Sequence, residues 1–467
     1  MKKSLSILMA IILVMSVFTG CNKDKKTNTV SKVELTTEYE NSTELVGDPN
    51  ATGELKIAYY YPEYKDYNDQ LKTAVAKYKK LYPNVLVNVN RPETGSKPNY
   101  EIYNDYRNNL DNLLDSSSGT DVVFFRNNID IKKLIDKELL FDLTDLMNND
   151  PIPNMDQLNS SVIYSSQLNQ KQYFMPLGYF MSVLMTTEQI QKEQQFKLTE
   201  CKDYTSIAEL ISSIIAKGTS SQAQLTGYIS FPKFFPWISD IDCCNAEQLH
   251  NCLVNDETKK AFEQYKTSFF SFETMDTEKY NNLYTLFPEN LNSKRLYIGE
   301  INNGLNDLLN TYKIVETGSK PIVAPWRKNN ESIQAFWNYG VGISNKSKNK
   351  TNAYNFIKVL LSNEIQICPE FEGQLYYYPI SNEAICKYLK NQLLSKDLLF
   401  GKENKKDSRT EFINELISLI SQTDASGITL DYLEIISNAM QPYFKGTKSY
   451  EECIKDVESK IQAYVLK

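Results

Sequence analysis

The sequence predicts an α/β protein built on an open, largely parallel sheet with helices on both faces. Two observations carry this prediction. Strand-like and helix-like segments alternate along the chain from residue 55 onward, and the strand-like runs are short and apolar. Ligands of such sheets bind beyond the carboxyl ends of the strands, so binding residues are expected in the segments that follow the strands.

The alternation begins with a strand over residues 55–61 and a helix over residues 69–82, whose apolar side chains recur on one face. Pro83 ends this helix, and alternate valines over residues 85–89 predict the second strand. The elements expected next are a helix over 103–114, a buried strand over 122–125 and a helix over 131–137. Much later, residues 353–361 place apolar side chains on one face of a further helix.

The N-terminus has the pattern of a secretory signal. A basic head (Lys2, Lys3), an apolar run over residues 5–17 and small residues before Cys21 predict a signal peptide over residues 1–20. The apolar run is shorter than the roughly 20 residues that a membrane-spanning helix needs. Its end resembles the lipobox of bacterial lipoproteins, which implies cleavage before Cys21 and lipid, palmitate included, on that residue. The alternative is an ordinary signal peptide with an incidental cysteine.

The segment that follows is polar and lacks apolar periodicity. Lys, Glu, Thr, Asn and Ser dominate it, so it cannot bury enough surface to offset the entropy of ordering. We expect residues 21–53 to form a lipidated, flexible tether that holds a folded body away from the cell wall. The alternative is a poorly ordered terminus with no such role.

Composition limits the classes of protein that the body can belong to. The remaining length is enough for two or three domains, and the hydrophobic content of 41% suits a protein with a sizeable core. The net charge of −7 argues against a nucleic-acid partner, because phosphate binding needs a basic face. No later run of 18 apolar residues occurs, so no second membrane segment is expected.

Cysteine spacing does not predict a metal site or a cofactor. Cys243, Cys244 and Cys252 are close in sequence, but they form neither a CxxC nor a CxxH pattern. Scattered core thiols are therefore the preferred interpretation. One disulfide in the 243–252 region stays open, since an exported protein can form one.

The motifs of common enzymes are missing. His250 is the only histidine, no G-x-S-x-G motif surrounds a serine, and no phosphate-binding glycine loop is present. The sequence therefore predicts a protein that is not an enzyme. An anchored glycoside hydrolase is the remaining alternative, because a pair of carboxylates cannot be excluded by counting acidic residues.

Several segments carry a resemblance to a known family, and their order and spacing strengthen it. They are Gly119-Thr120-Asp121-Val122-Val123-Phe124 and the segments over residues 76–85, 135–144, 169–178, 339–344 and 446–452. The chain resembles the extracellular solute-binding lipoproteins of carbohydrate ABC importers, which are similar to maltose-binding protein. The resemblance covers nearly all of residues 55–466.

This resemblance implies a periplasmic-binding-protein-like fold of two hinge-connected lobes, each a largely parallel sheet flanked by helices. Lobe one is expected over residues 54–177 plus 295–323, and lobe two over residues 178–294 plus 324–467. Hinges are expected near residues 176–180, 294–298 and 323–326. The family binds its ligand between the lobes, and binding favours the closed state.

The resemblance also implies the partners and the location. They are a carbohydrate ligand, the permease subunits of an ABC importer, and the outer face of the bacterial cytoplasmic membrane, reached through the N-terminal lipid. The receptor is expected to be monomeric. A sugar-sensing or adhesion lipoprotein that is not coupled to import is the alternative, because it needs the same cleft.

Sugar recognition combines aromatic rings, which stack on the C–H faces of the ring, with polar side chains that pair with its hydroxyls. Aromatic and polar residues near expected strand ends and crossings are therefore candidate ligand contacts. They are Tyr60, Tyr61, Phe125, Asn127, Asn128, Phe180, Phe234, Phe235, Trp237, Glu300, Asn302 and Trp337. The alternatives are a hydrophobic loop over residues 231–237, a solvated turn after residue 125, and core packing of Phe180.

Overall fold

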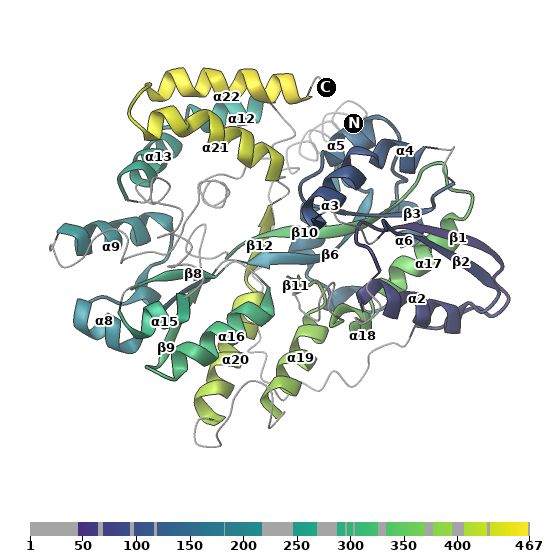
Figure 1. Cartoon of the computed structure of the whole chain (residues 1–467), viewed down its shortest axis with the longest axis horizontal. Coiled ribbons are helices and arrows are strands. Elements are labelled where there is room, and N and C mark those ends of the chain that lie inside the picture. The colour runs from purple at the N-terminus through teal and green to yellow at the C-terminus, as the bar shows by residue number, and fades with distance from the viewer. Residues whose placement is uncertain are drawn as a thin grey trace, which may run out of the picture.

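The computed structural model describes residues 45–63, 69–93, 98–115, 119–181, 183–216, 246–268, 287–294, 297–301, 304–325, 333–368, 377–394, 406–426 and 430–465. Two lobes lie side by side, the first on the right and the second on the left in Figure 1. Two long strands, β6 (Phe174–Met181) and β10 (Ile333–Ile343), lie between them. The α/β class and the two lobes expected from the sequence are confirmed.

The first lobe is built on a sheet with the strand order β11-β6-β10-β3-β1-β2, and β12 pairs with the beginning of β10. The other strands are β1 (Gly53–Ala58), β2 (Val85–Asn90), β3 (Val122–Arg126), β11 (Tyr378–Pro379) and β12 (Thr423–Ser426). β1, β2 and β3 are parallel, as strands joined by helices should be. β10 is antiparallel to β3 and β6, so the sheet is mixed rather than largely parallel.

Helices lie on both sides of these strands. In Figure 1, α3, α4 and α5 lie above the strands, and α2, α17 and α18 lie below them. The first-lobe helices are α2 (Gln70–Leu81), α3 (Asn99–Asn108), α4 (Leu110–Leu114), α5 (Ile131–Asp136), α6 (Thr144–Asn149), α17 (Lys350–Leu360) and α18 (Asn363–Gln366). The helix expected over residues 103–114 is two helices, which meet at Asn109.

Local sequence explains where α2 begins and which face it buries. The side chain of Asp69 accepts a hydrogen bond from the backbone N–H of Lys72 at 2.7 Å, which caps the first turn. Leu71, Ala74 and Tyr78 are buried, as the apolar periodicity predicts. The Tyr78 hydroxyl donates to the backbone carbonyl of Asn352 in α17, so α2 and α17 pack together.

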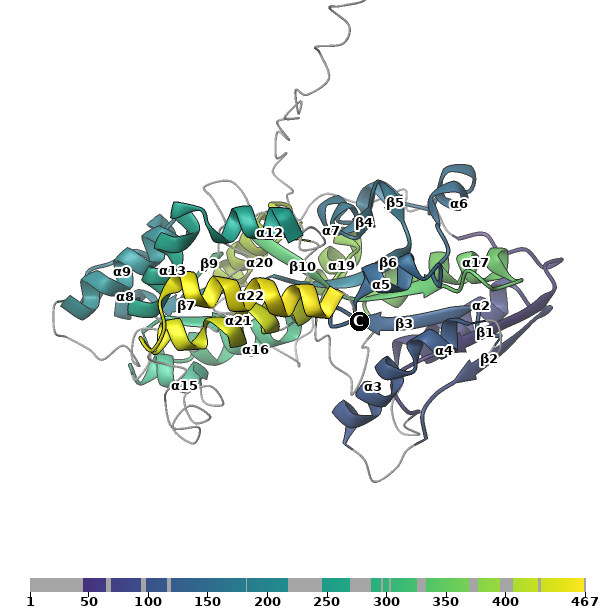
Figure 2. The ribbon, with the colours of Figure 1, turned by 90° about the horizontal axis from the view of Figure 1, so that it is seen from above.

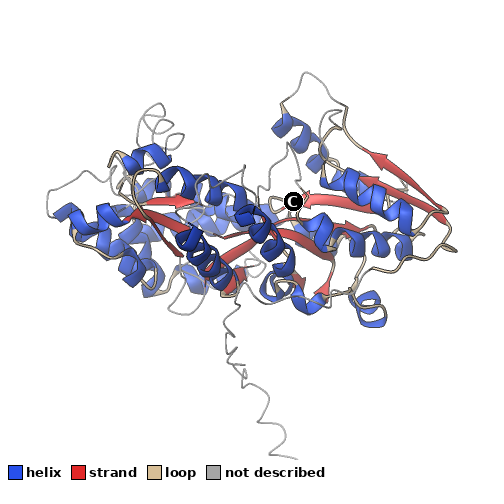
Figure 3. Cartoon of the chain, turned by 90° about the horizontal axis from the view of Figure 1, so that it is seen from below, coloured by secondary structure: helices blue, strands red, loops and turns tan. Residues whose placement is uncertain are grey.

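The second lobe has a smaller sheet of order β8-β7-β9 in which both strand pairs are antiparallel. Its strands are β7 (Val183–Thr187), β8 (Gly299–Ile301) and β9 (Pro321–Pro325). Helices make up most of the rest of this lobe (Figure 3). They are α8 (Glu188–Gln194), α9 (Tyr204–Ala216), α12 (Ala246–Leu253), α13 (Asp256–Ser268), α15 (Phe287–Asn292), α16 (Leu305–Glu316), α21 (Leu430–Phe444) and α22 (Tyr450–Val465).

Short elements and two longer helices complete the described chain. They are η1 (Met155–Gln157), α7 (Ser160–Ser165), β4 (Gln167–Leu168), β5 (Lys171–Gln172), η2 (Leu198–Glu200), α19 (Asn382–Leu394) and α20 (Lys406–Ile420). Figure 2 shows α7 and α19 between the second-lobe helices on the left and the first-lobe sheet on the right, whereas α20 packs on α16 of the second lobe. No helix within the described ranges is long and apolar enough to cross a membrane.

Strand pairing corrects the expected division of the chain between the lobes. Residues 295–323 are expected in lobe one, but β8 and β9 both pair with β7, which places this range in the second lobe. Residues 333–366 are expected in lobe two, but β10 pairs with β3 and α17 packs on α2 in the first lobe. The chain therefore returns to the first lobe between β9 and β10. The order of similar segments along a sequence does not say which strands pair, which is why the prediction failed.

The folded body also begins earlier than expected. The backbone carbonyls of Pro49 and Thr52 accept hydrogen bonds from the side chains of Asn84 (2.8 Å) and Asn352 (3.0 Å). A side chain at Gly47 would lie 2.2 Å from the carbonyl oxygen of Leu81, so the segment runs directly against α2. Residues 45–52 thus belong to the first lobe rather than to a tether, whereas the predicted signal peptide and Cys21 lie outside the described residues.

Candidate ligand-binding site

The carboxyl end of β3 faces the second lobe. β10 arrives from the second lobe and runs antiparallel to β3, with Tyr339 opposite Arg126 at the last residue of β3. The loops after β1 and β3 therefore lie on the side of the first lobe that faces the second. Parallel α/β sheets place their ligands at this edge, and the candidates predicted after β1 and β3 lie here.

Arg126 is at the centre of an aromatic cluster formed by these loops and α3. Its guanidinium carbon lies 5.3 Å from the ring centre of Tyr61, 5.6 Å from that of Tyr60 and 5.9 Å from that of Tyr103. A guanidinium within about 6 Å of a ring face is attracted to it, and planar stacking limits the orientation of its donors. Arg126 and Tyr61 are both partly exposed, so the cluster places a guanidinium group beside an aromatic surface.

Helix α3 fixes the loop after β3 from one side. The Tyr103 hydroxyl donates to the side-chain oxygen of Asn128 at 2.5 Å and accepts from the backbone N–H of Arg126 at 3.2 Å. Arg107 donates to the backbone carbonyl of Asn128 at 3.0 Å. The partly exposed Asn128 is therefore positioned before any ligand arrives, which reduces the entropy lost on binding.

Asn127 fixes the same loop from the other side. Its backbone N–H donates to the carbonyl of Asn338 at 2.8 Å, and its side-chain amide donates to the carbonyl of Trp337 at 2.7 Å. These carbonyls belong to the part of β10 where its register with β6 shifts. Asn127 thus connects the loop of the candidate site to a strand that passes between the lobes.

Four residues expected to contact a ligand are buried. Tyr60 and Phe125 have 0% of their surface exposed, Asn127 has 1% and Trp337 has 2%. Tyr60 stacks on Tyr59 with 4.7 Å between ring centres, and Trp337 packs on Phe174 at 4.8 Å. In this arrangement their side chains pack in the core, and we infer that they support the site rather than contact the ligand directly. Their aromatic and amide character was the only sequence signal, and it serves packing equally well.

The other candidates are distributed differently. Phe180 is partly exposed near the end of β6, where its ring contacts that of Phe336 at 5.7 Å between centres. Glu300 is on β8, opposite Leu184, in the second lobe. Phe234, Phe235, Trp237 and Asn302 lie outside the described residues, as does the lipidation candidate Cys21. The described site is therefore the first-lobe half of the expected one, with Tyr61, Arg126 and Asn128 at its surface.

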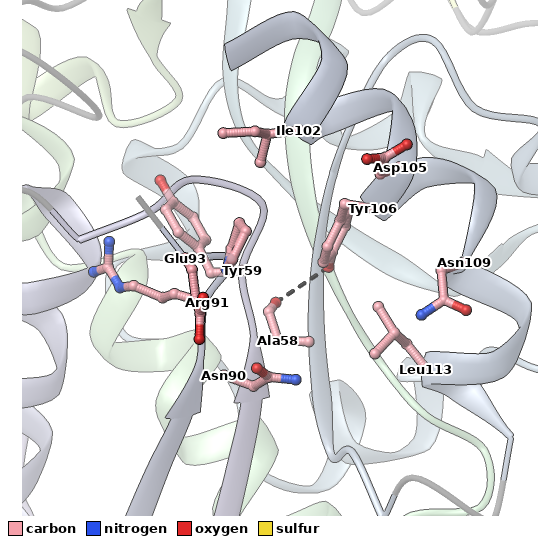
Figure 4. A pocket seen from close by; sticks show the side chains of 11 residues that line it. Ala58, Tyr59, Asn90, Arg91, Glu93, Ile102, Asp105, Tyr106, Asn109 and Leu113 are labelled. Carbon is pink, nitrogen blue, oxygen red and sulfur yellow. Dashed lines mark hydrogen bonds between the residues drawn. The ribbon is translucent and has the colours of Figure 1, made fainter. Parts of the chain in front are cut away.

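A pocket of about 350 Å³ lies beside this cluster, between the carboxyl ends of β1 and β2 and the helices α3 and α4 (Figure 4). The strand side is lined by Ala58, Tyr59, Asn90, Arg91, Pro92 and Glu93. The helix side is lined by Ile102, Asp105, Tyr106, Asn109 and Leu113. Polar side chains therefore surround an apolar wall, which is typical of sites for small organic ligands.

Internal bonds hold the walls of this pocket. Arg91 forms a bidentate ion pair with Asp69, with N–O distances of 2.7 and 2.9 Å, and its guanidinium lies 5.0 Å from the ring centre of Tyr59. The Tyr106 hydroxyl donates toward the carbonyls of Ala58 (3.2 Å) and Phe124 (2.9 Å). Burial raises the pKa of Tyr106 above its usual value, so the hydroxyl remains a donor.

Sequence reasoning placed Arg126 in the expected binding loop but not among the predicted contacts, and it missed Tyr103 and the pocket entirely. Arg126 carried one signal, since it is the charged residue that directly ends an apolar strand. Tyr103 has no such signal, because its place beside Arg126 depends on how α3 packs.

The described residues contain no group of three or more His, Cys, Asp and Glu side chains that could hold a metal ion. His250 lies on α12 and contacts Glu458 of α22, in the second lobe. The possible disulfide near residue 252 is not tested, because Cys243 and Cys244 lie outside the described residues.

Comparison with protein families identifies the chain. The sequence model of a family described as bacterial extracellular solute-binding protein matches residues 93–384, which is more than half of the chain. The chain belongs to this family. None of the curated proteins compared with this solute-binding protein matches it in sequence.

Solved structures support the two-lobed fold. The bacterial solute receptor AcbH, described as having an exclusive substrate preference for β-D-galactopyranose, superimposes with a TM-score of 0.60 at 11% identity, over 88% of this chain and 99% of AcbH. The sugar-binding protein MalE from Xanthomonas citri gives 0.59 at 11% identity, over 87% and 96%. A sugar transporter from Rhizobium etli in an open conformation gives 0.56 at 15% identity, over 88% and 99%. At these identities the similarity establishes the fold.

Proposed function

We propose that this solute-binding protein is a receptor that binds a sugar or oligosaccharide between its lobes and delivers it to an ABC importer. The observation that carries the proposal is the cluster of Arg126, Tyr61 and Asn128 at the edge of the first lobe that faces the second. It combines an aromatic surface with N–H donors and an amide, which is the chemistry that a sugar ring needs. The carbohydrate receptors among the structural neighbours support the same class of ligand.

The proposal is for a binding protein without catalytic activity. The arginine–aromatic cluster is suited to holding a neutral polyol. The partners described for Arg126 and Asn128 are tyrosine rings, the Tyr103 hydroxyl and the Arg107 guanidinium rather than a nucleophile and its base. We therefore expect the bound sugar to be released unchanged. The acidic net charge of −7 also suits a receptor without a nucleic-acid partner. We propose in addition that the receptor acts as a monomer.

A thermal-shift experiment across a panel of sugars tests this function. The chain without its signal peptide should be stabilised by one sugar or a related group of sugars, because a ligand that binds only the native state raises the unfolding temperature. A short peptide mixture and divalent metal ions are the control ligands. Stabilisation by either control, with no response to any sugar, would contradict the carbohydrate assignment.

We also propose that Cys21 carries the lipid that holds the receptor at the outer face of the cytoplasmic membrane. The sequence around Cys21 resembles a lipobox, and the family is extracellular. Cys21→Ser should move the protein from the membrane fraction to the soluble fraction and leave its affinity for sugar unchanged. Fractionation of cells expressing each form provides the measurement. Membrane association of the serine variant equal to that of the native form would exclude lipidation at this cysteine.

A further inference from the structure

We infer that Asn127 is a positioning residue that couples the ligand-binding loop to a bend in β10 between the lobes. This inference rests on the proposed function and gives a role to one buried residue of that site. Asn127 lies between Arg126 and Asn128, the residues proposed to face the sugar, but only 1% of its own surface is exposed. Its side chain therefore acts on the backbone around it rather than on the ligand.

β10 is irregular at the position that Asn127 contacts. Trp337 is opposite Tyr179 of β6. Two residues further along β10, Tyr339 is opposite Gly178, the residue next to Tyr179. Asn338 therefore has no counterpart on β6. An extra residue of this kind is a β-bulge, which bends the strand that carries it.

Asn127 forms hydrogen bonds with two successive residues of this bulge. Its backbone N–H donates to the carbonyl of Asn338 at 2.8 Å, which continues the pairing of β3 with β10. Its side-chain amide donates to the carbonyl of Trp337 at 2.7 Å. Successive carbonyls of a regular strand point toward opposite neighbours, so one residue reaches both only where the strand is bent. The side-chain bond therefore fixes the bend relative to the loop.

The bulge is located where β10 changes its partners between the lobes (Figure 1). Residues 333–336 pair with β12, whereas residues 339–343 pair with β3 of the first lobe. β12 connects α20, which packs on α16, to α21, so it follows the second lobe. Hinges absorb lobe movement over a few residues, and residues 337–338 are the ones between these two attachments.

The bonds of Asn127 make the loop and the bend depend on each other. A sugar that orders Arg126 and Asn128 favours one conformation of the loop, and through Asn127 it favours one conformation of the bend. By linkage, the conformation of the bend changes the affinity of the loop by the same factor. Without the side-chain bond, sugar binding would have to order the loop and the lobes separately, which costs affinity.

The distance between the lobes, measured by electron spin resonance, tests this role. Spin labels on encoded ketone side chains at Leu86 and Val254 avoid the native cysteines. These residues are 62% and 53% exposed, on β2 of the first lobe and directly after α12 of the second. The sugar probe is whichever of glucose, galactose, maltose, maltotriose and xylobiose stabilises the native chain most.

Asn127→Ala removes the side-chain bond and keeps the backbone bond. It should broaden the distribution of interlobe distances in the sugar-free protein, because the bend is no longer fixed to the loop. It should also lower the affinity for the sugar probe by at least about tenfold, within the usual range for coupled sites. Asn127→Leu fills the space of the amide without its donor, and it should give the same result if the alanine variant is too unstable to measure.

Two asparagine variants are matched controls. The side chain of Asn352 is also buried and donates to the carbonyl of Thr52 at 3.0 Å, near the amino end of β1. Asn352→Ala loses a similar bond away from β10, so it should keep the native distances and the native affinity. Asn128→Ala alters the loop without a contact to the bend, so it should bind the sugar more weakly and keep the native sugar-free distances.

The sugar-free distances separate the inference from the proposed function. A native distribution in sugar-free Asn127→Ala would overturn the inference and leave the proposed function intact. Equal broadening in Asn352→Ala would overturn it as well, because the effect would then belong to any lost bond in this lobe. If the native protein binds no sugar, the proposed function fails, and the sugar-free distances still decide whether Asn127 holds the bend.

Discussion

Arg126→Ala should weaken sugar binding by about 1–3 kcal/mol, which is roughly a 5- to 150-fold loss of affinity. The substitution removes the guanidinium group that lies over Tyr61 at 5.3 Å, so the aromatic surface of the proposed site loses its cation. The native fold should persist, because Arg126 is partly exposed at the end of β3. Calorimetric titration with the sugar found in the panel measures the effect.

Two further variants show whether the loss belongs to the site. Arg126→Lys keeps the charge but lacks the planar group that stacks on tyrosine, so it should recover only part of the affinity. Lys132→Ala removes a cation a few residues later, where the side chain pairs with Asp136 on the surface of α5, and it should bind as the native protein does. If Arg126→Ala binds sugar as tightly as Lys132→Ala, the cluster does not form the site.

Trp337→Ala should lower the free energy of unfolding by about 3–5 kcal/mol, the usual loss for removing a buried tryptophan from a core. Only 2% of the Trp337 surface is exposed, and its ring packs on Phe174 and Phe125 with centres 4.8 and 6.3 Å apart. Removing the indole leaves a cavity at the position where β10, β6 and β3 meet. Denaturant unfolding of the native and variant proteins without ligand measures the difference.

The same variant separates packing from ligand contact at Trp337. Trp337→Phe keeps an aromatic ring in the core and should lose less stability than the alanine variant. At temperatures where each variant is folded, we expect its sugar affinity to remain within a few-fold of the native value. A Trp337→Ala protein of native stability that has lost its affinity would restore the interpretation of Trp337 as a ligand contact.

Local sequence patterns predicted local structure well. The capped and amphipathic helix α2, the valine alternation of β2 and the apolar run of β3 occur almost where expected, because each depends on neighbouring residues. The inward face of α17 is also as predicted, with Ala353, Phe356 and Ile357 fully buried. The α/β class followed from the order of these elements.

Features that depend on long-range pairing were not predicted. β8 and β9 pair with the two edges of β7, and the direction of β10 gives the first sheet its mixed character; neither leaves a signal in the composition of these strands. The candidate site shows the same limit. Phe125 and Asn127 are both expected in the binding loop, but both side chains are buried. Arg126, which lies between them in the sequence, is partly exposed. Alternation along the strand places Phe125 and Asn127 on the face opposite to that of Arg126. Which of the two faces is buried depends on β10 and α3.

The most direct test of the central proposal is a calorimetric titration of the chain, without its predicted signal peptide, with the sugar that stabilises it most, followed by recovery of that sugar. We predict one saturable binding event per protein molecule and a sugar that is recovered chemically unchanged. The absence of saturable binding, or cleavage of the sugar during the titration, would contradict the account of this protein as a carbohydrate receptor.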